Sequence, residues 1–275
     1  MTGPHERAAQ HDIETPDTVQ DRFGIAFLDA NPADATAVLS MPMSGLRNPF
    51  TDAPTIGPLA ILVDAAGGIV NHYLRRTDQW TVSSELSIEL SPDSIDDHDA
   101  PVAASARTLG RVGATSLSIC TLTCGDTVIG AGTVRSFYIP ATELTGERPP
   151  ETLVRTTHTT LSDLMAVHVQ TVDDGVRVLR QRADPILNNE IAMLHGGVAA
   201  AGLELTASAA INCDRSGFLR TASLRVNFLR PFIAGRSSRH VGTPLRIGRS
   251  TAVGDALAIG DDGKVAVTAR VTAYR

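Results

Sequence analysis

The sequence predicts an α+β fold, present twice, in which antiparallel strands curl around a long apolar helix. The first observation is the stretch Asn188–Asn212, where a polar loop and a His-Gly-Gly triplet lead into a helix rich in Ala and Leu. This helix has no polar face, so other structure should wrap it on all sides. The second observation is that alternating segments typical of antiparallel strands follow it. The third is that the same order of segments occurs in the first half of the chain.

In the first half, two apolar stretches flank Asn31–Asp34, a pattern typical of a hairpin or of a short helix that leads into strands. A loop rich in Gly, Pro, Asn and Asp precedes a second apolar helix, which begins after the Gly57-Pro58 pair and carries a single acid, Asp64. Segments of alternating polarity, separated by turn residues, follow between Thr81 and Ile139. We therefore expect one helix followed by several antiparallel strands.

The second half repeats this order after a polar, proline-rich linker. Asp64 matches Glu204 at an offset of 140 residues, and Leu109-Gly110-Arg111 matches Ile247-Gly248-Arg249 at an offset of 138. A nearly constant offset across separate elements indicates a tandem duplication. The predicted divisions are a flexible leader at 1–17, an N-terminal unit at 18–139, a linker at 140–155 and a C-terminal unit at 156–275.

Composition excludes several classes of protein. A chain of 275 residues with 43% hydrophobic content suits one large domain or two ordinary ones. The net charge of -6 and an aromatic content of only 4% argue against nucleic acid as a partner. The sequence has neither an eighteen-residue apolar run nor a hydrophobic signal region at its polar N-terminus, so we expect no membrane span, no export and a location in the cytoplasm.

Cysteine and histidine give no sign of a metal site. Cys120 and Cys124 share one face of an expected strand, and together with Cys213 they form no even framework for disulfides. We interpret them as small buried hydrophobic residues. The histidines show no ligand spacing, so neither a metal nor another cofactor is expected.

The motifs together resemble one known family. An Asn-bearing loop, His-Gly-Gly opening an apolar helix with an acid two turns on, and the LRVNFLRP stretch in the following strands are similar to the hotdog-fold acyl-CoA thioesterases of the phenylacetate-pathway type. The resemblance covers essentially all of the chain beyond the leader, once per half. It implies a tandem double hotdog, with two antiparallel sheets that are each wrapped around a central apolar helix. It also implies that the sheets of the two units are continuous, that the helices face each other, and that two composite sites lie between the units.

The resemblance assigns site residues in both halves. In the C-terminal half the family motif falls on Asn189, His195, Gly196 and Glu204, with Thr221 as a strand hydroxyl. In the N-terminal half the acid is Asp64 and the hydroxyl is Ser83, but Thr55 stands where His is expected and Ile56 where Gly is expected, and Asn48 is one position out of register. Gly196 and Glu204 are separated by about 12 Å along one helix, too far apart to act on the same carbon. Each site must therefore combine the amide donors of one half with the acid of the other half.

Crossing gives one site in which Asn189, His195 and Gly196 face Asp64 and Ser83, and another in which Thr55 and Ile56 face Glu204 and Thr221. The first has every expected part, so we predict that it is the working site for hydrolysis of an acyl-CoA to a carboxylic acid and free CoA.

Each group has an expected role at the first site. The Gly196 N–H, at the positive end of the helix dipole, would bind the thioester oxygen, with Asn189 as a second donor. Asp64 would act as a general base or as a nucleophile, and Ser83 would orient the water or the acid. His195 would hold the loop and the start of the helix. Arg111 and Arg249 could contact CoA phosphates, although solvated charges are an equal interpretation.

Two other functions remain open at this stage. A hotdog protein that binds acyl-CoA without chemistry would keep the fold and lose the reaction. A hotdog enoyl-CoA hydratase is less favoured, because such enzymes resemble a pattern with Asp and His in a loop before the helix. The acyl group, its length, the activity of the second site and the oligomeric state stay open, and association of double hotdogs would use sheet faces or edges.

Overall fold

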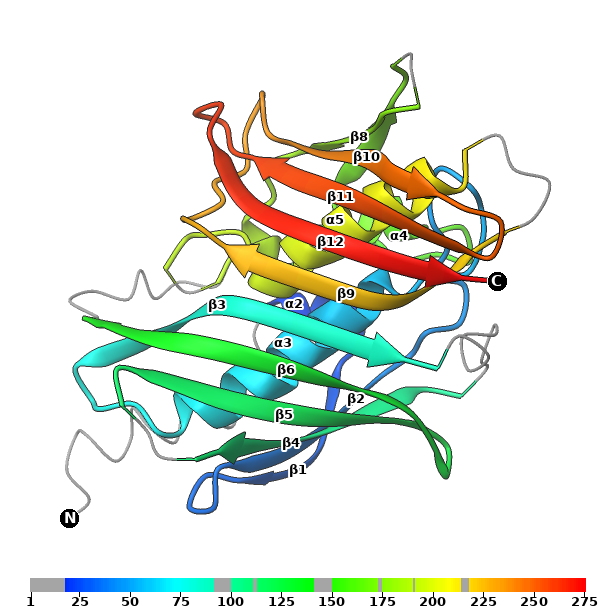
Figure 1. The fold of residues 1–275 in the computed structure, drawn as a ribbon. Helices are drawn as coiled ribbons and strands as arrows, with labels where there is room; N and C mark the ends of the chain where they lie inside the picture. The colour runs from blue at the N-terminus through cyan, green and yellow to red at the C-terminus, as the bar shows by residue number, and fades with distance from the viewer. Residues whose placement is uncertain are drawn as a thin grey trace.

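A computed structural model describes residues 18–91, 100–110, 113–140, 150–172, 175–189, 191–213 and 218–275. The expected leader and residues 141–149 of the expected linker lie outside the described residues. The described chain forms one antiparallel sheet of 12 strands, in the order β1-β2-β4-β5-β6-β3-β9-β12-β11-β10-β8-β7. Two long helices lie behind this sheet in the view of Figure 1.

The elements of the two halves follow each other in the same order. The first half contains α2 (Thr18–Phe23), β1 (Ala26–Asn31), β2 (Thr36–Met41), α3 (Gly57–His72), β3 (Gln79–Leu90), β4 (Val102–Leu109), β5 (Thr115–Cys124) and β6 (Thr127–Pro140). The second contains α4 (Leu161–Leu164), β7 (Val167–Gln170), β8 (Arg177–Gln181), the 3-10 helix η2 (Pro185–Leu187), α5 (Gly196–Ile211), β9 (Arg220–Phe228), β10 (Arg239–Ile247), β11 (Thr251–Ile259) and β12 (Val265–Tyr274). Both alternatives considered for the start of the first half are present, since a short helix precedes a hairpin.

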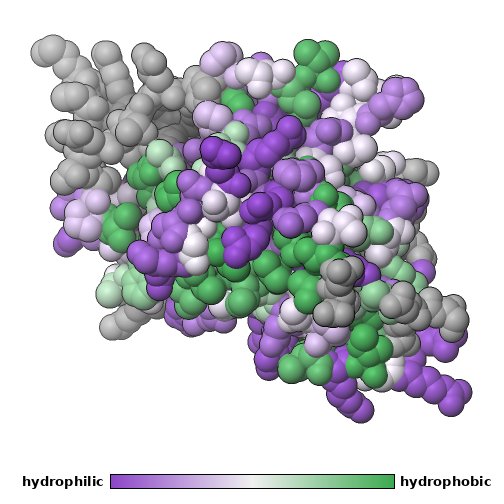
Figure 2. Space-filling model, turned by 90° about the horizontal axis from the view of Figure 1, so that it is seen from above, coloured by the Kyte–Doolittle hydropathy of each residue, from purple (hydrophilic) through white to green (hydrophobic). Residues whose placement is uncertain are grey.

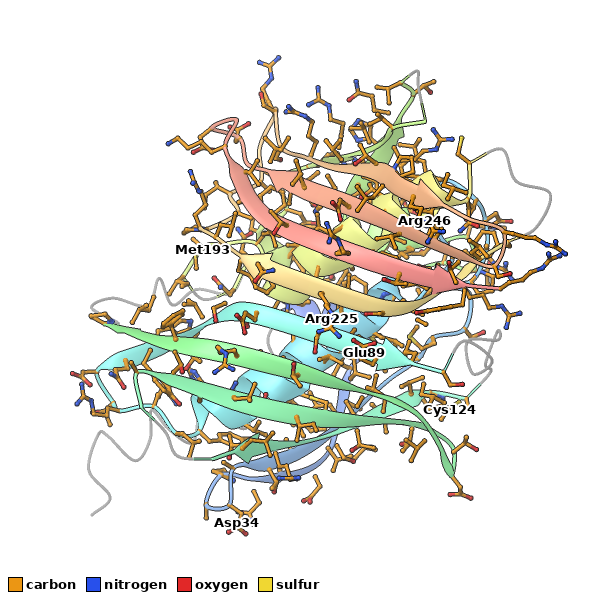
Figure 3. The ribbon with its side chains drawn as sticks, viewed as in Figure 1. Asp34, Glu89, Cys124, Met193, Arg225 and Arg246 are labelled. Atoms are coloured by element: carbon orange, nitrogen blue, oxygen red, sulfur yellow. The ribbon has the colours of Figure 1, made fainter. Side chains whose placement is uncertain are left out.

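The sheet is symmetric about the junction between β3 and β9. Reading outward from this junction, the strands of the two halves come in corresponding order. At the junction Leu86 pairs with Val226, and the Glu89 carboxylate accepts a hydrogen bond from Arg225 on the neighbouring strand (Figure 3). The prediction of two sheets is therefore corrected to one continuous sheet, because backbone pairing between β3 and β9 joins the two six-stranded halves. This pairing gives partners to backbone groups that would otherwise form two exposed edges.

The two long helices pack against each other as well as against the sheet. α3 lies against β2–β6 and α5 against β8–β12. They run antiparallel, since Gly57 at the start of α3 lies beside Ala201 and Gly197 at the start of α5 lies beside Ile61. A Cβ atom at Gly197 would come within 2.5 Å of the Ile61 Cα, so only glycine permits this approach. The antiparallel crossing places the beginning of each helix against the middle of the other.

Burial explains why an apolar helix without a polar face is stable here. Every residue of α5 from Gly197 to Ile211 is buried between the sheet and α3. The strands alternate between buried and more exposed side chains, as in β2 and β11, because one sheet face covers the helices and the other meets solvent. The surface in Figure 2 accordingly mixes hydrophilic and hydrophobic side chains. In the described part of the chain, no helix is both long and apolar enough to cross a membrane.

Candidate active site

The carboxylate of Asp64 lies where the two halves meet, in the middle of α3 and against the start of α5. Its Oδ1 accepts a hydrogen bond of 2.7 Å from the Ser83 hydroxyl on β3. Its Oδ2 accepts one of 2.7 Å from the Gly197 N–H of the other half. His195 Nδ1 lies 3.4 Å from the same oxygen. The structure thus brings together Asp64, Ser83 and His195, which are far apart in the sequence. We call this group, with Asn189 and Gly196, the Asp64 site.

The first residues of α5 supply backbone donors at this point. The first N–H groups of an α-helix have no partner within the helix. Gly197 directs its N–H to Asp64, whereas the N–H of Gly196 has no hydrogen-bond partner among the described residues. Gly196 also lies directly beside the acid, because a Cβ atom added to it would be 2.8 Å from Asp64 Oδ2. An unused N–H at the positive end of a helix dipole, next to a carboxylate, can bind a developing oxyanion.

His195 is the N-cap residue of α5. Its Nδ1 accepts a hydrogen bond of 3.1 Å from the Gly197 N–H, and its own N–H donates to the Leu187 carbonyl at 2.8 Å. The ring therefore helps to fix the start of the helix, in line with the role expected for it. Its side chain is only 10% exposed, so its orientation is set by the surrounding protein.

The amide oxygen of Asn189 is held by hydrogen bonds, whereas its amide nitrogen is available to a ligand. Its Oδ1 accepts hydrogen bonds from the N–H groups of Ile191 and Met193 at 3.2 and 3.1 Å, so the loop determines how the amide is turned. No partner for its Nδ2 is found in the part of the chain that the structure describes. Met193 of this loop lies at the end of the sheet where β9 stops (Figure 3). Asn189 is therefore a preoriented donor.

The equivalent group in the other half, which we call the Glu204 site, has its own acid at its centre. Glu204 accepts hydrogen bonds from the hydroxyls of Thr55 and Thr221, at 2.6 and 2.7 Å. The Thr55 hydroxyl also accepts from the Gly57 N–H at 3.2 Å, as His195 does from Gly197. Each acid thus accepts a hydrogen bond from the other half of the chain, Asp64 from Gly197 and Glu204 from Thr55.

The Glu204 site is buried more completely than the Asp64 site. Ile56 stands at the position of Gly196 and is 1% exposed, as is Glu204. Burial raises the pKa of Glu204, although hydrogen bonds from Thr55, Thr221, Ser208 and the Gly57 backbone oppose this effect. Asp64 is also buried, at 6% exposed, but Gly196 and Ser83 beside it are partly exposed.

A second difference lies one helical turn beyond each acid. In the Glu204 site, Asn48 Nδ2 donates to the Ser208 hydroxyl at 3.0 Å and to the Leu205 carbonyl at 2.9 Å, so its amide is fully used. The position equivalent to Ser208 in α3 is Gly68, and a Cβ atom added there would meet nothing within 4 Å. The absent side chain leaves space beside Asp64 and leaves no hydroxyl for Asn189.

The sequence did not single out three residues that shape the site. Gly197 holds Asp64 through its N–H, Gly68 leaves space, and the ring of Phe228 lies 3.3 Å from where a Gly196 Cβ would be. The second Gly of the His-Gly-Gly triplet and the 140-residue offset between Gly68 and Ser208 were signals for the first two. Phe228 belongs to the LRVNFLRP stretch, but nothing in this pattern indicated its contact with Gly196, which depends on how β9 meets α5.

Of the two arginines expected near CoA, Arg111 lies outside the described residues. Arg249 is exposed in the turn between β10 and β11. Strand pairing links this end of the sheet to Thr221, since the nearby Ile247 pairs with Ala252, Ala252 with Ala273, and Ala273 with Thr221. Arg246, just before this turn, lies at the end of the sheet away from Met193 (Figure 3). Arg249 is therefore on the side of the Glu204 site, and the structure does not place it at the Asp64 site.

The prediction that the cysteines are buried holds for Cys120, whereas Cys124 and Cys213 are only partly buried. All three are free thiols, and burial raises the pKa of Cys120 to about 12. His240 is completely buried against Gly202, and burial lowers its pKa to about 4. Within the described ranges, no group of three or more His, Cys, Asp or Glu side chains is arranged to hold a metal ion.

Comparisons with known proteins agree with this architecture. The family model of the acyl-CoA thioesterase N-terminal domain matches residues 186–274, which contain the His195 loop, α5 and β9–β12. A search of curated proteins finds no match.

Solved structures match along nearly the whole chain. The tesB protein of Mycobacterium avium subs paratuberculosis is 11% identical, with 94% of this chain and 99% of that chain covered and a TM-score of 0.63. A putative thioesterase from Novosphingobium aromaticivorans is 12% identical, with 90% and 98% covered and a TM-score of 0.61. A protein of unknown function with a hot dog fold from Alicyclobacillus acidocaldarius is 12% identical, with 94% and 98% covered and a TM-score of 0.56.

At such identities the structural likeness establishes the hotdog fold alone. The family model shows in addition that residues 186–274 match an acyl-CoA thioesterase domain. This confirms the resemblance found in the sequence at the level of the fold and of that domain.

Proposed function

We propose that the protein is an acyl-CoA thioesterase with one working site, the Asp64 site, built from both halves of the chain. Asp64 and Ser83 come from the first half, and Asn189, His195 and Gly196 come from the second. The observation that carries the proposal is the carboxylate of Asp64 held against the start of α5, beside an N–H of Gly196 that has no partner among the described residues. The match of residues 186–274 to the model of an acyl-CoA thioesterase domain supports the same reaction class.

The thioester carbonyl would bind at the beginning of α5. Its oxygen would accept hydrogen bonds from the Gly196 N–H and from the Asn189 amide, two donors whose directions the fold sets in advance. Donors that are already oriented stabilise the negative charge on this oxygen in the transition state without reorganisation. The space beside Gly68 would admit the carbonyl group between these donors and Asp64.

Asp64 would then act on the carbonyl carbon in one of two ways. As a general base it would take a proton from a water molecule that attacks the carbon. As a nucleophile it would attack directly and form a mixed anhydride, which water would then hydrolyse. The hydrogen bond from Ser83 would hold the carboxylate in either case. A single turnover in ¹⁸O-labelled water distinguishes them, because only the anhydride route can leave the label in the Asp64 carboxylate.

The test is to replace each acid separately. Asp64→Ala should abolish the release of free thiol from acyl-CoA, whereas Glu204→Ala should retain much of it, because only Asp64 lies beside the unused N–H of Gly196. Steady-state assays with short, medium, long and aryl acyl-CoAs provide the measurement and also identify the acyl group. Equal losses in both variants would contradict a single working site.

A protein that binds acyl-CoA without hydrolysing it is the second candidate, since at the Glu204 site this fold buries the acid almost completely. Such a protein would give a thermal shift with acyl-CoA but no free thiol. Loss of enoyl-CoA absorbance without thiol release would instead support the hydratase. A cytoplasmic location and an assembly of several double hotdogs stay predictions.

A further inference from the structure

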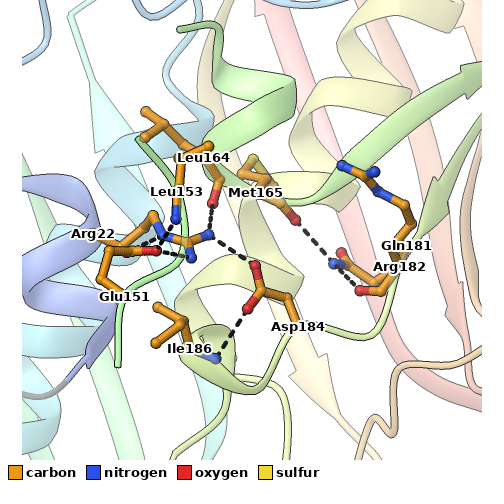
Figure 4. Close-up of polar contacts among 9 residues, drawn as sticks. All are labelled: Arg22, Glu151, Leu153, Leu164, Met165, Gln181, Arg182, Asp184 and Ile186. Carbon is orange, nitrogen blue, oxygen red and sulfur yellow. Dashed lines mark hydrogen bonds and ion pairs between the residues drawn. The ribbon is translucent and has the colours of Figure 1, made fainter. Parts of the chain in front are cut away.

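An ionic cluster lies outside the proposed site and is centred on the buried Arg22 of α2. Its guanidinium group donates hydrogen bonds to both carboxylate oxygens of Glu151, to Asp184 Oδ2 at 2.9 Å and to the Leu164 carbonyl at 3.3 Å. Figure 4 shows these groups converging on Arg22. The Arg22 side chain is only 1% exposed. We call Arg22, Glu151 and Asp184 the Arg22 clasp.

The clasp joins three segments that are distant in the sequence. Arg22 lies near the start of the described chain, Glu151 lies within the expected linker, and Asp184 lies between β8 and α5. A buried guanidinium is tolerated only when it is paired and its donors are satisfied. Hydrogen bonding from Arg22 lowers the pKa of Glu151, so the pairing favours the ionised carboxylate. Removing one partner would therefore loosen the other two segments.

A short series of hydrogen bonds leads from the clasp to the Asp64 site. Asp184 Oδ1 accepts from the Ile186 N–H at 3.1 Å and so caps η2. The Leu187 carbonyl, at the end of η2, accepts from the His195 N–H at 2.8 Å. A bridge between Asn188 and Leu194 closes the intervening loop. Arg22 thus anchors the base of the loop that presents Asn189, His195 and Gly196.

Among the described residues, no such cluster is found in the other half of the molecule. The loop that leads to Thr55 begins with residues 42–46, and this stretch contains no charged side chain. The helix that corresponds to α2 is α4, which contains Ser162 and Asp163 but no arginine. In the part of the chain that the structure describes, a buried arginine with two carboxylate partners holds the loop that serves the Asp64 site and not the equivalent loop. A purely general stabilising role would not require this asymmetry.

We propose that Arg22 is a positioning residue for the Asp64 site: through Asp184 and η2 it fixes the loop that carries Asn189 and the Gly196 N–H. This inference rests on the proposed function. The clasp restricts loop movement, so both donors stay aligned with the thioester oxygen. A donor that moves by about 1 Å can cost up to a hundredfold in rate, and for this reason a contact so far from the carbonyl matters.

The test is Asp184→Asn, which keeps a side-chain oxygen to cap η2 but removes the charge that faces Arg22. We expect kcat to fall about tenfold, with KM changed less than about twofold, because transition-state contacts are lost while ground-state binding remains. Hydrogen exchange of peptides covering residues 186–197 should become faster. Asp255→Asn is the matched control, since it breaks an exposed ion pair with Arg270 in the same half and should change neither measurement.

Arg22→Lys is the second variant, because lysine retains the charge but cannot hold two carboxylates in the same fork. It should show the same pattern as Asp184→Asn. Unchanged kcat and unchanged exchange in both variants would overturn the proposal, and so would a lower Tm with kcat unchanged well below it. If the wild-type protein releases no thiol from any acyl-CoA, the proposed function fails, and faster loop exchange then still decides whether Arg22 fixes the loop.

Discussion

The Asp64 site and the Glu204 site are two versions of one arrangement. In both, a carboxylate from the middle of one helix faces the start of the other and accepts a hydrogen bond from a strand hydroxyl. The acids, the strand hydroxyls and the residues that precede the helices, His195 and Thr55, differ in type but occupy the same places. Two further differences change the space around the acids, since Gly196 and Gly68 in one site correspond to Ile56 and Ser208 in the other. Asp64 is 6% exposed and Glu204 is 1% exposed. If only the Asp64 site works, as we propose, a site needs space and free donors in addition to a carboxylate.

The largest expected effect comes from giving the Asp64 site the isoleucine of the Glu204 site. In Gly196→Ile the new Cβ would lie 2.8 Å from Asp64 Oδ2 and 3.3 Å from the Phe228 ring, so the side chain would occupy the place of the thioester oxygen. We expect kcat/KM to fall by about a thousandfold, comparable to the loss of an oxyanion donor. Thiol release measures this, and circular dichroism checks that the fold persists. A variant that folds and retains wild-type activity would refute the proposed oxyanion position.

A smaller effect is expected from transferring the serine. In Gly68→Ser the new hydroxyl should accept a hydrogen bond from Asn189 Nδ2, as Ser208 does from Asn48, and so remove one donor from the substrate. We expect kcat/KM to fall about tenfold, because the Gly196 N–H would still donate to the oxyanion after Asn189 is lost as a donor. Ser208→Gly is the reciprocal control and should leave activity unchanged. Equal activity of both variants would show that the Asn189 amide does not contact the substrate.

The smallest effect concerns the Glu204 site. Because burial raises the pKa of Glu204, the folded state holds its proton up to a higher pH than the unfolded state does. Burying the protonated form of Glu204 carries no charge penalty. The free energy of unfolding therefore falls as the pH rises from the pKa of Glu204 in the unfolded state through its pKa in the folded state. Glu204→Gln should remove this loss and raise Tm by about 2–4 °C at alkaline pH, which corresponds to about 1 kcal/mol.

Thermal unfolding of this variant and the wild type across pH provides the measurement. The difference in Tm should shrink toward acid pH, where Glu204 is protonated in both states. Thiol release should stay within about twofold of the wild type, since catalysis is assigned to the other acid. A Tm difference that grows as pH falls would contradict the direction of the shift.

Much of the fold could be predicted because its signals are local. The apolar helices have no polar face, and the strands alternate with a period of two, so both were recognisable from the sequence. The joining of the two halves into one sheet depends on β3 pairing with β9, and backbone groups carry no sequence signal for such a partner. The resemblance to continuous hotdog sheets indicated this arrangement, but periodicity alone did not.

The acids of the two sites could also be predicted, because charged residues in apolar helices are costly and stand out. The different roles of the glycine residues could not be predicted. Gly67, Gly68 and Gly197 look alike in the sequence, but Gly67 and Gly197 allow close packing, whereas Gly68 leaves open space. The Arg22 clasp also had no signal, since Arg22 lies more than a hundred residues from both of its carboxylate partners.

The sequence by itself determined the two apolar helices, their acids and the repeat that relates them, because these follow from side-chain chemistry and spacing along the chain. Only the tertiary structure decided which acid has free donors and space beside it. The antiparallel crossing of α3 and α5 brings Asp64 to the Gly197 N–H and Glu204 to Thr55. Contacts between residues about 130 to 150 positions apart depend on how whole elements pack, and no local pattern encodes that packing.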